Sequence, residues 1–180
     1  GLPELRRSVA DYLGRRFDVV VDPDTQVMPT SGSKEAVFNT PLAFIDRAAS
    51  DAVVYPTPGY PVYERGALFA GAEVHPVVLN GDFVMRVEDI TDDAWERARL
   101  VWACTPHNPT GSVTTAAELA ALVDRCRAEK ALFLSDECYA DVYEVEAFPE
   151  GPASAMQVSG PDFEGVLAFF SCSKRSGMTG

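Results

Sequence analysis

Residues 166–180 read Val-Leu-Ala-Phe-Phe-Ser-Cys-Ser-Lys-Arg-Ser-Gly-Met-Thr-Gly, an apolar run of one strand's length followed by a turn of small residues. The turn holds one lysine, Lys174. A lysine at the tip of a buried strand is typical of an amine that reacts with carbonyl groups, because partial burial favours its neutral, nucleophilic form. Taken alone, the pattern is also that of a surface lysine in an ordinary loop. The partners of Lys174 must therefore come from other segments.

The composition sets limits on the class of protein. The 180 residues are enough for one substantial core, and 47% of them are hydrophobic and 23% charged. A net charge of −12 argues against binding to nucleic acid or to an anionic membrane, because both need basic patches. We expect no membrane span and no signal peptide. The four cysteines show no C-x-x-C spacing, which predicts no zinc or other metal site and no disulfide framework, and favours a cytoplasmic location.

Apolar strands alternate with amphipathic helices along the chain. This alternation is typical of an α/β fold with a mainly parallel sheet and helices on both faces. No internal repeat or linker divides residues 1–180, so we expect a single domain. Strands are expected at 26–28, 51–55, 73–79, 99–104, 131–135 and from 166. Helices are expected at 3–16, after Lys34 with a kink at Pro41, at 61–70, and from a Thr115–Glu118 capping box to Lys130.

Five expected strand ends carry turns of unusual composition. In a parallel sheet the carboxyl ends of the strands meet at one edge, and ligands bind there. We therefore expect the five turns to converge, and this convergence is more informative than any single motif. The turns are Ser31–Lys34, Pro56–Tyr60, Asn108–Gly111, Asp136–Tyr139 and Ser171–Lys174.

Two of these turns indicate a chemistry. Gly32, Ser33 and Lys34 open a helix, whose free N–H groups favour an anion such as phosphate, although a plain helix start is an equal interpretation. The turn is not a Walker loop, because Pro29 stands where that motif needs glycine. Asp136 directly follows an apolar strand, where a carboxylate needs a cation or hydrogen-bond donors. A protonated ring nitrogen about 4 Å away would gain roughly 4 kcal/mol, although a loop salt bridge is the alternative.

These segments together resemble one enzyme family. Their order and spacing are similar to those of the class I/II, fold-type I pyridoxal-phosphate aminotransferases. The last eight residues, 173–180, look most like succinyldiaminopimelate aminotransferases. The motifs that carry the resemblance are Lys34-Glu35, Tyr60-Pro61-x-Tyr63, Asn108-Pro109-Thr110-Gly111, Asp136-Glu137-Cys138-Tyr139 and Ser171-Cys172-Ser173-Lys174.

The resemblance implies a role for each residue, with Lys174, Asp136 and Tyr139 as the catalytic ones. Lys174 would bond to the aldehyde of pyridoxal 5′-phosphate and then move the α-proton, and Asp136 would pair with the pyridinium nitrogen. Asn108 and Tyr139 would hydrogen-bond the phenolate oxygen, and Tyr60 would stack on the ring. The phosphate would be held by Gly32, Ser33, Lys34 and Ser171.

The resemblance also implies parts that lie outside this chain. These are a phosphate-binding arginine beyond Gly180, the C-terminal arginine that binds the substrate carboxylate, and most of a small domain. Residues 1–180 would then be an incomplete large, cofactor-binding domain, inactive alone and homodimeric when full length. The resemblance further implies a cis Asn108–Pro109 bond.

The expected reaction moves an amino group between an amino acid and a 2-oxo acid, with succinyldiaminopimelate and glutamate as candidate substrates. Aspartate and aromatic donors stay open. So does another pyridoxal-phosphate reaction on the same fold, a C–S β-lyase or a decarboxylase. A serine hydrolase is disfavoured, because the chain has no G-x-S-x-G motif and only two histidines.

Overall fold

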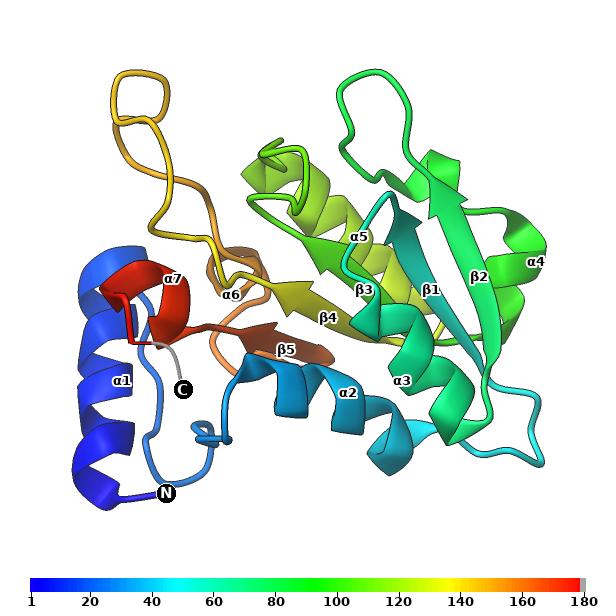
Figure 1. The fold of residues 1–180 in the computed structure, drawn as a ribbon, viewed down its shortest axis with the longest axis horizontal. Coiled ribbons are helices and arrows are strands. Elements are labelled where there is room, and N and C mark those ends of the chain that lie inside the picture. The colour runs from blue at the N-terminus through cyan, green and yellow to red at the C-terminus, as the bar shows by residue number, and fades with distance from the viewer. Residues whose placement is uncertain (179–180) are drawn as a thin grey trace.

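The computed structural model describes residues 1–178 and contains one five-stranded sheet (Figure 1). The strand order is β2-β1-β3-β4-β5, and every neighbouring pair is parallel. This confirms the predicted α/β fold with a parallel sheet. The strands are β1 (Ala52–Thr57), β2 (Glu73–Val78), β3 (Ala98–Cys104), β4 (Leu132–Asp136) and β5 (Val166–Phe169).

Helices cover both faces of the sheet, as predicted (Figure 1). On one face, α2 (Ser33–Phe44) and α3 (Val62–Ala70) pack on alternate strand residues through Val37, Tyr63 and Ala67. The opposite face packs against a 3-10 turn and three helices. These are η1 (Val87–Asp89), α4 (Asp92–Arg97), α5 (Ala116–Ala128) and α6 (Ala155–Val158).

The first and last helices lie together beyond the β5 edge (Figure 1). Helix α1 (Pro3–Phe17) buries Leu13 and Phe17 in a third cluster, and Phe170 packs against it just before α7 (Cys172–Ser176). The ring of Phe170 lies 5.7 Å from that of Phe17. Helices α1 and α7 therefore lie together where β5 ends, just before Lys174. None of the helices within residues 1–178 is long and apolar enough to cross a membrane.

Three local predictions were wrong or incomplete. Residues 26–28 form no strand, because no described strand runs beside them to share backbone hydrogen bonds, and Met28 is 83% exposed. No end was predicted for the helix after Lys34, which ends at Phe44 and contains Pro41. The short η1, α4 and α6 were not predicted, because helices of three to six residues leave little periodicity to read.

Candidate active site

Four of the five predicted turns do follow strands and meet at the carboxyl edge of the sheet. They follow β1, β3, β4 and β5, which are adjacent in the sheet. The fifth turn, Ser31–Lys34, follows no strand and opens α2 instead, so that part of the prediction was wrong. It still lies near the sheet, because Val37 of α2 packs on β1, β3 and β4. Burial raises the pKa of the nearby Cys138 thiol, and Ser33 opposes that rise.

Asp136 ends β4 and is aligned with Cys104 on β3 and Phe169 on β5. Its carboxylate is buried, with only 5% of the residue exposed. Tyr63 Oη donates a hydrogen bond to Oδ2 at 2.5 Å, and the backbone N–H of Cys138 donates to Oδ1 at 3.2 Å. No lysine, arginine or histidine of residues 1–178 lies within ion-pair distance of it. The two donors fix the carboxylate, and its negative charge has no cationic partner in the described part of the chain.

Tyr60 and Tyr139 stand beside this carboxylate. Burial raises the pKa of the Tyr60 phenol, and the negative charge of Asp136 raises it further. Burial also raises the pKa of Tyr139, with added contributions from Cys104 and Asp136. Both phenols therefore keep their protons at neutral pH and can act as hydrogen-bond donors.

Lys174 lies in α7, and its Nζ atom is 5.8 Å from the centre of the Tyr139 ring. The amine is therefore near the predicted partners. Contrary to the sequence-based expectation of partial burial, the residue is exposed. The reason is that the turn after β5 winds into a helix of five residues, and no segment of residues 1–178 covers its outer side.

Part of the predicted phosphate-binding group is free to donate hydrogen bonds, although the Gly32 N–H already donates to Thr30 O at 2.8 Å. Gly32 caps α2 with φ 84°, a conformation that favours glycine, and no side chain caps the helix start. The N–H groups that open α2 are consequently available to an anion. Ser171 caps α7 by accepting from the Ser173 N–H at 3.2 Å, which leaves the Ser171 hydroxyl hydrogen free.

Asn108 lies half-buried in the turn after β3, and its bond to Pro109 is cis, as the resemblance implied. The neighbouring His107 is buried and holds this turn together. The backbone N–H of His107 donates to Ser112 O at 2.8 Å, and the imidazole Nδ1 lies 2.8 Å from Thr110 Oγ1. The imidazole therefore bonds within its own loop, and burial lowers its pKa.

Glu137 is a functional candidate for which no role was predicted from the sequence. It is 1% exposed, and its Oε1 accepts from Ser135 Oγ at 2.8 Å and from the N–H of Ala155 at 2.9 Å. Its Oε2 is buried without a partner among the described residues. Burial raises the pKa of this carboxyl to about 7. Its position next to Asp136 in the sequence was the only available signal.

We expect Glu137 to make stability depend on pH. The folded-state pKa is raised above the ordinary 4.5, so this contribution is complete below pH 4.5 and is lost as pH rises through about 7. The full effect is about 3 kcal/mol. The measurement is the free energy of unfolding in urea of the wild type and of Glu137→Gln. The wild-type value minus the variant value should fall by most of this amount between pH 5 and 8, because glutamine does not titrate. Parallel pH profiles for the two proteins would contradict the assignment.

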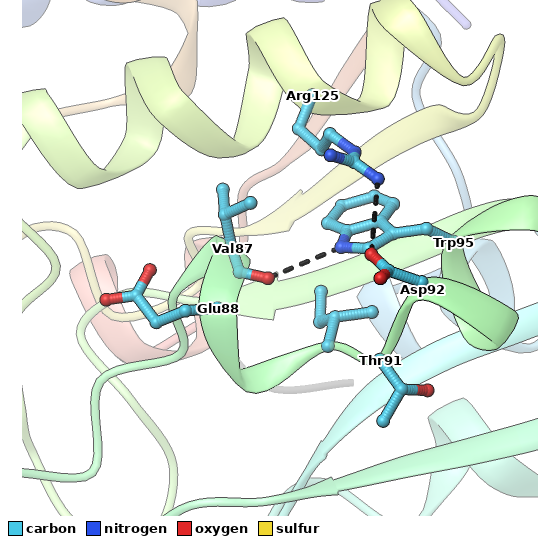
Figure 2. Close-up of a pocket in the computed structure, with 7 residues that line it drawn as sticks. Val87, Glu88, Thr91, Asp92, Trp95 and Arg125 are labelled. Carbon is cyan, nitrogen blue, oxygen red and sulfur yellow. Dashed lines mark hydrogen bonds and ion pairs between the residues drawn. The ribbon is translucent and has the colours of Figure 1, made fainter.

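Two cavities of the structure are lined mainly by residues that were not predicted to bind the cofactor. One, of about 410 Å³, lies between η1, α4 and α5, where Trp95 Nε1 donates to Val87 O at 3.3 Å (Figure 2). Arg125 lies over the Trp95 ring there and 3.9 Å from Asp92. In Figure 1, α4 and α7 are at opposite ends of the sheet. A second cavity of about 460 Å³ adjoins the Asn108 turn through Pro106 and Gly111.

The residues at the strand ends fit pyridoxal phosphate. They provide an amine for its aldehyde, a buried carboxylate with no counter-ion among residues 1–178 for its ring nitrogen, and a helix start without a side-chain cap for its phosphate. The Tyr60 ring is left for the face of the cofactor ring, and the Asn108 and Tyr139 side chains are left for its phenolic oxygen. Among residues 1–178 no three histidine, cysteine or acidic side chains gather to hold a metal ion.

The fold and the candidate site fit a cofactor-dependent transferase, and comparison with known proteins gives the family. The model of the family "Aminotransferase class I and II" matches residues 1–180. The chain belongs to the class I and II aminotransferases.

Individual relatives agree with this membership. The LL-diaminopimelate aminotransferase of Aquifex aeolicus is 37% identical over 182 residues, covering all of this chain and 46% of the relative. A solved aminotransferase from Neisseria meningitidis is 33% identical, with a TM-score of 0.90 over 99% of this chain and 46% of that one. An aromatic aminotransferase from Pyrococcus horikoshii has a TM-score of 0.86 at 26% identity, over 99% and 47% of the two chains. The chain thus spans about half the length of the relatives it matches.

Proposed function

We propose that this chain forms the cofactor-binding part of a longer transaminase that uses pyridoxal phosphate. The observation that carries the proposal is the buried Asp136 carboxylate, which has two donors and no cation among residues 1–178. A protonated ring nitrogen would supply that cation. The small domain and the arginine for the substrate carboxylate would come from outside the chain. The match to about half of each relative supports this division.

Each side chain has a defined task in this proposal. When bound, pyridoxal phosphate supplies an electron-withdrawing ring that stabilises negative charge at the carbon that loses its proton. Lys174 Nζ would form the covalent bond to the cofactor and then carry that proton. Asp136 would keep the ring nitrogen protonated, and Asn108 and Tyr139 would donate to the phenolic oxygen. Tyr60 would cover one ring face. The phosphate would be held by Gly32, Ser33, Lys34 and Ser171.

The substrates we propose are a diaminopimelate-type amine and a 2-oxo acid, in lysine biosynthesis. The names of the curated relatives support this choice, and they point to LL-diaminopimelate where the chain's last residues resembled succinyldiaminopimelate enzymes. Part of that resemblance, residues 179–180, lies outside the described residues. An aromatic donor is the second candidate, favoured by the likeness to the aromatic aminotransferase structure.

We also propose that the full-length protein is a cytoplasmic homodimer. The resemblance to the family supports the dimer. A reducing compartment is supported by the four cysteines, all of which are free: Cys104, Cys126, Cys138 and Cys172.

Product analysis separates transamination from the alternative reactions. The protein is expressed over the full length of its open reading frame, here called the longest encoded form of the chain, and loaded with pyridoxal phosphate. It should consume an amino donor only when a 2-oxo acid is added. It should form one amino acid per 2-oxo acid consumed, because the amino group is conserved. Release of ammonia would indicate a β-lyase, and release of carbon dioxide a decarboxylase. Either product in stoichiometric amount, without an acceptor, would contradict the proposal.

A further inference from the structure

One carboxylate joins three segments that are distant in the sequence. Asp141 Oδ2 accepts from Tyr12 Oη at 2.8 Å and pairs with Arg175 Nε at 2.9 Å. Its Oδ1 pairs with Arg16 Nε at 3.1 Å. Tyr12 and Arg16 are one turn apart on α1, Asp141 lies two residues beyond Tyr139, and Arg175 directly follows Lys174. We call Tyr12, Arg16, Asp141 and Arg175 the Asp141 cluster.

The Asp141 cluster differs from an isolated surface ion pair. The side chains of Asp141 and Arg16 are only 21% and 16% exposed. The guanidinium of Arg175 lies 3.9 Å from the centre of the Tyr12 ring, so it is held by stacking as well as by charge. Arg16 also donates to the carbonyl of Ala140 at 3.2 Å. Planar stacking, shared acceptors and partial burial give such a network more weight than a single exposed pair.

Helix α7 needs a contact of this kind. It has five residues, and a helix that short is unstable without tertiary contacts. Its start is capped by Ser171, and its end by Gly177 in the left-handed region. Met178 also hydrogen-bonds to Cys172 and Ser173. Outside the helix, the Phe170 ring packs against Tyr12 and Phe17. The ion pair of Arg175 with Asp141 is a charged contact that joins this helix to the turn after Tyr139.

We infer that Asp141 is a positioning residue that holds the Lys174 amine against the Tyr139 turn. It acts through Arg175 and touches neither the cofactor nor the reacting atoms. The inference rests on the proposed function only in that Lys174 is taken as the amine that bonds to the cofactor. Without the Asp141 charge, two guanidinium groups would face each other with no anion between them. We therefore expect α7 to move away from α1.

Hydrogen exchange on the cofactor-free protein tests the contact directly. In the longest encoded form of the chain, Asp141→Asn should speed amide exchange in residues 171–178 about tenfold, because a charged hydrogen bond is lost. Exchange in β3 and α5 should not change, which separates loss of position from global unfolding. Asp24→Asn is the matched control, because Asp24 also pairs with an arginine of α1, Arg6, at 3.1 Å.

The reactivity of the lysines gives a second readout that a merely structural role would not move. The chain has three lysines, and Lys130 at the end of α5 serves as the internal reference for Lys174. Reductive methylation with formaldehyde, followed by peptide mass analysis, should show a Lys174-to-Lys130 ratio changed at least threefold in Asp141→Asn. Asp141→Glu should restore the ratio in part, since it keeps the charge.

The outcomes distinguish this inference from the proposed function. Unchanged exchange in 171–178 together with an unchanged lysine ratio would overturn the role of Asp141, even if pyridoxal phosphate bonds to Lys174. Faster exchange in a protein that never binds the cofactor would support the contact and overturn the proposed function. If Asp141→Asn does not fold, Arg175→Gln is used instead, since it removes only the ion pair between Arg175 and Asp141. It should speed amide exchange in residues 171–178 to the same extent.

Discussion

Replacement of Lys174 by alanine is expected to lower transamination by at least about 10⁴-fold, because the residue would supply both the covalent bond and the proton transfer. The alanine variant should also fail to hold pyridoxal phosphate after dialysis. The rate is measured in single turnovers with excess amino donor, so that cofactor loss and slow chemistry are distinguished.

Lys130→Arg is the matched control for this variant. Lys130 is the only lysine outside the proposed site, and arginine keeps its charge at the same left-handed position. The control should keep full activity. A Lys174→Ala protein that retains more than about a hundredth of the wild-type rate would contradict the role given to Lys174.

Replacement of Asp136 by asparagine is expected to have the second largest effect. The carboxylate is buried with no cation among residues 1–178, and an ion pair of about 4 Å at an effective dielectric near 20 is worth roughly 4 kcal/mol. The loss corresponds to about 10³-fold in kcat/KM. Asparagine keeps the shape and can still accept the hydrogen bond from Tyr63, so the fold should be retained.

Asp124→Asn provides the comparison for Asp136→Asn. Asp124 is an exposed acid on α5, and removing its charge should change kcat/KM less than twofold. Circular dichroism of all three proteins checks that the fold is the same. A change below tenfold in Asp136→Asn would show that the carboxylate does not face a positive charge during the reaction.

The sheet could be predicted from the sequence because each of its strands is an apolar run that can be recognised from local sequence alone. The five observed strands each fall on a predicted run, and the capping box that opens α5 is present, with Thr115 N donating to Glu118 Oε2 at 2.9 Å. Residues 26–28 were mispredicted because strand formation depends on a neighbour as well as on residue type. Local pattern carries no information on that neighbour.

The candidate site could be predicted in part for the same reason. Polar turns at the ends of parallel strands were sufficient to place Asp136, Asn108 and Lys174 at one edge. The hydrogen bond between Tyr63 and Asp136 joins residues 73 apart, and that between Tyr12 and Asp141 joins residues 129 apart. Contacts at such separations follow from the packing of α3 and α1, which no local motif records.

The central claim is that Lys174 is the amine that binds pyridoxal phosphate, and one measurement tests it most directly. The longest encoded form of the chain is mixed with pyridoxal phosphate, reduced with borohydride, digested and analysed by peptide mass. The account predicts one cofactor per chain on Lys174 and no label on Lys34 or Lys130, the other two lysines. A label on either of those, or a label on the Lys174→Ala protein in equal amount, would contradict it.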